Sequence, residues 1–251
     1  TEFQSRGAIK NIFSEAEVST PLSTTGTCSI AELFQQVSRI IYEHDEIDRY
    51  VIRYGFSQSE KSIGYFDATP DIRTLAYLLN AENKRKSDPD VTLDDFINEV
   101  TQSLKINGSI KAFFRMVQQV GGMIEAMPPI VYSFPSVACL LSGDKKISVI
   151  GTFDRLHYMP YHFAASLIPS ISVNQKELVA RAKQVASVLT KKGVVGHVII
   201  DFLAYNNGVQ IDFTGFDIRT NAYPAHLYSA YMTLCSGYNE ETGRMVLLKN
   251  I

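Results

Sequence analysis

Apolar and polar positions alternate along this chain with periods that switch between those of helices and those of strands. Residues 30–44 carry apolar side chains at the three- and four-residue spacing of a helix with one buried face, and Ser29 stands where an N-cap is expected. Residues 50–54 and 62–67 predict two strands, and the polar loop between them makes a hairpin. The same criteria predict further helices over 71–79, from Thr92, over 109–119, over 174–191 and over 222–235.

Strands are more frequent in the second half of the chain. Short apolar runs predict strands at 130–132, 137–141 and 147–153. Two longer apolar strands follow the helix that ends at Gly193, and an Asn-Gly turn joins them. The second half is therefore expected to be built around a sheet.

A pair of adjacent prolines divides the predicted elements. Pro128 and Pro129 would end any helix or strand that reached them. Helices and strands occur on both sides of this point. We therefore expect an α+β protein with an N-terminal domain over residues 1–127 and a C-terminal domain over residues 128–251.

Charged residues interrupt the two long apolar strands. Asp201 lies inside a Val-Ile-Ile-Asp-Phe run, and the partner strand ends in Asp217-Ile-Arg219. Such groups are costly to bury without a partner. They indicate either a place for a metal-bound phosphate chain or structural ion pairs of Asp201 with a nearby base and of Asp217 with Arg219.

Composition narrows the classes of function. The 251 residues carry a net charge of -2 and 45% apolar residues, which is typical of a globular protein and argues against a nucleic-acid surface. The basic triplet 84–86 predicts a solvated loop or a contact to nucleic acid or phosphate.

No apolar run approaches the roughly 20 residues of a membrane helix. Without a signal peptide or a paired-cysteine motif, a reducing cytoplasmic location is expected, and a chain that begins with Thr1 is expected to be processed or excerpted.

The order of several short motifs resembles the ATP-grasp fold, and more narrowly its carboxylate–amine ligase branch. The motifs that carry this resemblance are Phe134–Val137, Gly151–Arg155, Gly193–Asp201, Gly215–Arg219, Leu234–Gly237 and Glu241–Gly243. The combination also resembles the ATP-grasp-like region of the IQ-motif-containing protein H family. The resemblance implies two α+β lobes with a nucleotide cleft between them.

The resemblance also implies a chemistry and a set of site residues. ATP and magnesium would be the cofactors; a substrate carboxylate would attack the terminal phosphate, and an amine would displace the acyl phosphate. Charge on the transferred group must be met by metal and by basic side chains. By resemblance the metal ligands are Asp201 and Asp217, the catalytic residues are Arg219 and Arg155, and the cofactor-binding residues are Arg53, Lys61 and Glu125.

This chain departs from the family pattern in its metal strand. The family's Glu-x-Asn-x-Arg falls on residues 215–219, so that Gly215 replaces the glutamate and Asp217 the asparagine. Strand alternation predicts that residues 215, 217 and 219 share one face and that Asp212 points to the other, unless a bulge intervenes. The phosphate loop at 55–61 has a single glycine. His226 lies one place from the family's histidine, and a role on the helix surface or in the core is the alternative.

Two functions from different classes remain open on the sequence. The first is an ATP-dependent ligase with a modified site, which would take a nucleotide, a small carboxylate and an amine. The second is a catalytically inactive ATP-grasp-like scaffold that binds protein partners within a larger protein. By resemblance, that larger protein would bind calmodulin through segments outside this chain and act in sperm development. An unrelated α/β binding domain is a third reading.

Overall fold

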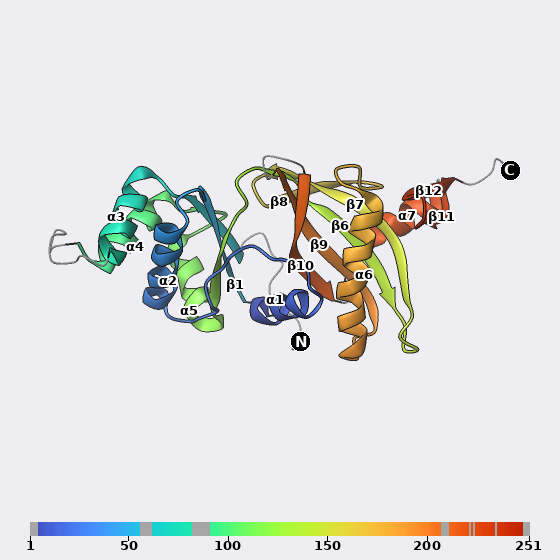
Figure 1. The fold of residues 1–251 in the computed structure, drawn as a ribbon, viewed down its shortest axis with the longest axis horizontal. Coiled ribbons are helices and arrows are strands. Elements are labelled where there is room, and N and C mark those ends of the chain that lie inside the picture. Colours follow the sequence, from blue (N-terminus) through green and yellow to red (C-terminus); the bar gives the residue numbers. More distant parts are fainter. Residues whose placement is uncertain are drawn as a thin grey trace. The chain divides into compact units, whose positions relative to one another are not determined.

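The computed structural model describes residues 5–55, 62–81, 91–206, 211–220, 222, 224–233 and 235–247. They form two compact units, Pro21–Pro129 and the combination of Thr1–Thr20 with Ile130–Ile251 (Figure 1). Each unit combines helices with an antiparallel sheet, which confirms the predicted α+β class. None of the described helices has both the length and the hydropathy that a membrane span requires.

The Pro21–Pro129 unit is a sheet covered by helices. The strands lie in the order β3-β2-β1-β4 and all pair antiparallel. Their bounds are β1 (Arg49–Tyr54), β2 (Ile63–Asp67), β3 (Lys105–Ile106) and β4 (Gly122–Ala126). The helices are α2 (Ile30–Glu43), α3 (Pro70–Asn80), α4 (Leu93–Ser103) and α5 (Ile110–Val120). The predicted hairpin and the predicted helices over this part of the chain are confirmed.

Side-chain caps fix the starts of these helices. The Ser29, Thr69 and Ser109 side chains each accept a hydrogen bond from a backbone N–H of the first turn that they precede. Thr92 and Asp95 form a reciprocal capping box at the start of α4. One apolar face of each helix then packs on the sheet, with Phe34 and Phe96 in edge-to-face contact in the core.

The second unit contains a larger sheet. Its strands lie in the order β10-β9-β6-β7-β8, and β5 pairs with the end of β9. Their bounds are β5 (Val131–Ser133), β6 (Pro135–Leu141), β7 (Ile147–Met159), β8 (His162–Leu167), β9 (Gly196–Asn206) and β10 (Ile211–Thr220). Also present are α1 (Arg6–Glu15), α6 (Gln175–Lys191), α7 (Ala225–Thr233) and the paired strands β11 (Cys235–Asn239) and β12 (Arg244–Leu247).

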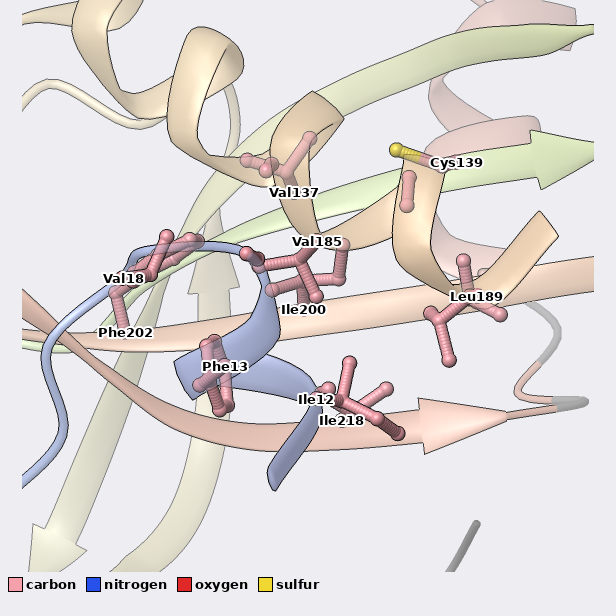
Figure 2. Packing of buried hydrophobic residues seen from close by; sticks show 14 of the residues in the cluster. Ile12, Phe13, Val18, Val137, Cys139, Val185, Leu189, Ile200, Phe202 and Ile218 are labelled. Carbon is pink, nitrogen blue, oxygen red and sulfur yellow. The ribbon is translucent and has the colours of Figure 1, made fainter. Parts of the chain in front are cut away.

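Helices α1 and α6 pack on the same core as β9 and β10. Figure 2 shows Phe13 and Ile12 of α1 beside Phe202 and Ile218 of the strands. The Phe13 and Phe202 rings meet edge to face with centroids 6.2 Å apart. The described residues up to Thr20 therefore group with those from Ile130 onward, whereas the predicted N-terminal domain spanned residues 1–127.

Candidate functional site

The opposite face of the large sheet carries the charged residues that the sequence singled out. The register pairs Asp201 of β9 with Ser136 of β6 on one side and with Asp217 of β10 on the other. Residues directly opposite each other in neighbouring strands project to the same face. Ile200 and Phe202, the neighbours of Asp201 along β9, pack in the core with α1 and α6, so Asp201 projects to the other face of the sheet.

Asp201 is closely surrounded by hydrogen-bond donors. Its Oδ1 accepts from Ser136 Oγ at 2.6 Å and from Arg219 Nη2 at 2.8 Å. Its Oδ2 accepts from Arg219 Nε at 2.9 Å and from Arg155 Nη1 at 3.2 Å. The side chain is 1% exposed. Burial alone would raise the pKa of Asp201, but the guanidinium groups of Arg219 and Arg155 and the hydrogen bonds outweigh it, so the pKa lies below its ordinary value.

Arg155 reaches Asp201 from β7, and its neighbour Asp154 points elsewhere. The Asp154 carboxylate accepts hydrogen bonds from the hydroxyls of Ser170 at 2.8 Å and Ser172 at 2.6 Å, and from two backbone N–H groups of that loop. The two neighbours thus have separate partners.

Asp217 is bound by a residue from the N-terminal helix. Arg6 Nη1 lies 2.9 Å from Asp217 Oδ1, and the guanidinium lies 5.9 Å from the centroid of the Phe216 ring. Burial and the nearby charge of Asp201 raise the pKa of Asp217, against the opposing effect of Arg6 and then of Arg219. Arg6 did not figure among the sequence-predicted site residues, because nothing in the local pattern near residue 6 links it to a strand two hundred residues away.

A β-bulge changes which residues of β10 share a face. Gly215 pairs with Phe202, but Asp217 already pairs with Asp201, so Phe216 is the extra residue. Gly215 therefore faces the helices, where an added Cβ would lie 2.4 Å from the Phe13 ring. The expectation that residues 215, 217 and 219 share one face is wrong.

The bulge also brings Asp212 to the Asp201 face, because it pairs with Tyr205, four residues along β9 from Asp201. That separation is ~13 Å along the strand, and Asp212 Oδ1 lies 3.3 Å from Arg181 Nη2. Asp212 therefore does not replace the missing glutamate, for a reason of distance and not of strand face.

Arg53 and Glu125, expected at the nucleotide, lie in the Pro21–Pro129 unit. Arg53 Nε and Glu125 Oε2 are 3.1 Å apart, and the side chains are 6% and 2% exposed. In the pairing of β1 with β4, Arg53 lies opposite Met123 and Glu125 lies opposite Val51, so the ion pair runs diagonally between the two strands. Lys61, the third expected cofactor-binding residue, lies outside the described residues.

Ser136 and His226 are neighbours of the cluster whose contacts only the structure shows. Ser136 lies within the Pro-Ser-Val segment that carried the family resemblance, so the motif could have pointed to it. The His226 ring meets Phe153 edge to face with centroids 4.6 Å apart. Burial and the charge of Arg219 lower the pKa of His226.

Magnesium does not fit the arrangement of these side chains. Mg²⁺ takes a near-octahedral set of oxygen ligands, usually from one or two carboxylates and waters. Both Asp201 oxygens already accept hydrogen bonds, mostly from cations, and Asp217 is paired with Arg6. Across the described part of the chain, no three His, Cys, Asp or Glu side chains are grouped so that they could hold a metal ion.

Comparison with known proteins identifies the fold and the family of this chain. The fold is that of the ATP-grasp proteins, as the resemblance predicted. The family described as "IQCH-like, ATP-grasp" matches residues 1–227, so the chain belongs to that family.

Solved structures share the fold at low sequence identity. N5-carboxyaminoimidazole synthetase from Staphylococcus aureus, complexed with ADP, matches with a TM-score of 0.57 and 12% identity over 99% of this chain and 53% of its own. Biotin carboxylase from Campylobacter jejuni, in a beta-gamma-ATP complex, matches with a TM-score of 0.60 and 12% identity over 92% and 43%. Pyruvate carboxylase from Rhizobium etli matches with a TM-score of 0.61 and 9% identity over 92% and 17%. The chain thus spans about half of these proteins or less, and the likeness concerns the fold.

Proposed function

We propose that this domain is an ATP-grasp scaffold that does not carry out magnesium-dependent phosphoryl transfer and acts as a binding or assembly module of a larger protein. The observation that carries the proposal is the closed shell of hydrogen bonds around Asp201, the residue at the family's first metal position.

The energetics of that shell oppose a metal. A cation that bound Asp201 would have to displace guanidinium groups from a carboxylate that is 1% exposed. Separating a buried ion pair typically costs about 3–5 kcal/mol. The position of the family's glutamate offers no ligand, since Gly215 has no side chain and faces Phe13.

The alternative is an active ATP-dependent carboxylate–amine ligase with ATP and magnesium as cofactors. Two observations favour it. Fold relatives are known in complexes with ADP and with ATP. Arg155 and Arg219 also lie together at one carboxylate, and basic side chains of this kind meet the charge of a transferred phosphoryl group.

The proposed module would have protein partners. The roles expected of the parent protein, calmodulin binding and sperm development, remain proposals that rest on the family resemblance. Calmodulin binding would use segments outside this chain and not the charged cluster on the sheet.

A thermal-shift experiment with ATP separates the two functions. Melting would be followed with ATP in the presence of magnesium or of EDTA, on the native chain, on Asp201→Asn and on Asp144→Asn, an exposed turn residue, as matched control. A ligand at about 100 times its Kd stabilises a fold by about 2.7 kcal/mol, which is readily measured. We expect no magnesium-dependent shift in any of them. A shift that requires magnesium, is lost in Asp201→Asn and is accompanied by ATP hydrolysis would establish the ligase instead.

A further inference from the structure

We infer that helix α1 has taken the place of the divalent cation at β10. Arg6 supplies the positive charge at Asp217, and the Phe13 ring fills the space beside Gly215. Removal of Arg6 makes the domain responsive to divalent cations. This inference rests on the proposed absence of magnesium-dependent chemistry.

Two carboxylates that lie in register on neighbouring strands repel each other. Asp201 and Asp217 are directly opposite in neighbouring strands, an arrangement in which like charges destabilise a sheet. Arg219 and Arg155 bind Asp201, whereas Asp217 has the Arg6 guanidinium at 2.9 Å. Arg6 therefore places a positive charge at Asp217, beside those that Arg219 and Arg155 place at Asp201.

The chain holds α1 firmly in the position that delivers Arg6. Ile9, Ile12 and Phe13 are buried in the core, and Ser5 caps the helix N-terminus. At the other end, Lys192 Nζ lies 2.8 Å from Glu15 Oε1.

The segment that follows α1 runs along β10. The backbone N–H of Gly215 donates to Ser19 O at 2.7 Å, and Thr214 Oγ1 donates to the same carbonyl at 2.6 Å. Because other contacts fix the helix, placing Arg6 costs little additional ordering of the backbone.

Phe13 explains why the helix and a metal-binding glutamate are incompatible. Its ring atoms lie 2.4 Å from the point where residue 215 would place a Cβ, a distance that side chains do not reach. With the bulge at Phe216, this position also faces away from Asp217. The loss of the glutamate and the pairing of Asp217 thus trace to the same helix.

The test measures melting of the chain without nucleotide. Native chain, Arg6→Ala and Arg6→Ala/Asp217→Asn would be melted in EDTA, in magnesium chloride and in manganese chloride, each against sodium chloride of equal ionic strength. Lys192→Ala is the matched control, because it removes a positive charge that belongs to the C-cap of α6 and contacts Glu15 at the far end of α1. We expect Arg6→Ala to melt lower in EDTA and to regain about 2 °C or more with a divalent cation. The native chain, the control and the double variant should show no such gain.

Two results would overturn the inference: an Arg6→Ala chain indifferent to divalent cations, or a native chain that they stabilise. If Arg6→Ala leaves too little folded protein, Asp217→Asn is compared with the double variant. The two should melt alike, because the neutral side chain no longer needs Arg6, and a double variant that stays unfolded would also overturn the inference. The proposed function is tested separately, by ATP on the native chain, so each can fail without the other.

Discussion

Arg219 binds Asp201 through two parallel hydrogen bonds, Nε to Oδ2 at 2.9 Å and Nη2 to Oδ1 at 2.8 Å. The two residues lie on neighbouring strands, with Arg219 opposite Ile199 and Asp201 opposite Asp217. Such a fork is geometrically specific as well as strong. In this domain it ties together strands β9 and β10.

Removing Arg219 is expected to destabilise the fold strongly. Arg219→Ala leaves a buried carboxylate without its main partner, and we expect a loss of about 3–5 kcal/mol in the free energy of unfolding. Arg219→Lys keeps the charge but not the fork, so its loss should be smaller. Urea denaturation measures both. Arg39→Ala, at a side chain 72% exposed and 4.0 Å from Glu43, serves as control and should stay within about 0.5 kcal/mol of the native value. Equal effects at the two arginines would contradict a structural role for the Asp201 pair.

The contact between Gly215 and Phe13 predicts a steric conflict. Gly215→Ala should cost about 1–3 kcal/mol, because the new Cβ would meet the Phe13 ring at 2.4 Å. Gly143→Ala is the matched control, since an added Cβ there has no neighbour within 4 Å. In the Phe13→Ala background the cost of Gly215→Ala should fall, so that the double variant is more stable than the sum of the two changes predicts. Strict additivity in chemical denaturation would show that the ring is not the obstacle.

His226 should make stability fall as the pH is lowered. Its pKa in the folded chain lies below the ordinary value of 6.5, because of burial and then of the charge on Arg219. The folded state therefore resists a proton that the unfolded state accepts. The resulting stabilisation is present above about pH 6.5 and is lost as the pH falls toward the folded pKa. Melting profiles of the native chain and of His226→Gln should converge or cross as the pH drops from neutral, and parallel profiles would show that His226 makes no contribution.

Local patterns predicted most of the elements. The spacing of apolar residues after Ser29 and the alternation at 50–67 predicted α2 and the β1–β2 hairpin, and both are confirmed. Their formation depends on residues close in sequence, which a pattern can reveal. Strand β8 was not predicted, and in the structure it is held by pairing with β7.

The residues of the candidate site were also predicted only in part. Asp201, Asp217, Arg219 and Arg155 were expected together, and the sheet brings them together. The bulge at Phe216 was not predictable, because one extra residue leaves no mark in an apolar strand. The Arg6 contact also escaped prediction, since it depends on how α1 docks on the sheet.

The last prediction concerns Arg53 and Glu125, where structural and nucleotide-binding roles differ in their consequences. Arg53 Nε and Glu125 Oε2 lie 3.1 Å apart, and both side chains are buried. If the pair is structural, Arg53→Met alone should cost about 3–5 kcal/mol, because it removes the guanidinium from the buried Glu125 carboxylate. Arg53→Met/Glu125→Met should recover part of that loss, since a buried pair replaced by apolar side chains is often tolerated. The coupling energy from this double-mutant cycle, measured by chemical denaturation, tests the structural role. A Glu125→Gln chain that keeps its stability but loses an ATP-dependent thermal shift would instead assign the glutamate to the nucleotide.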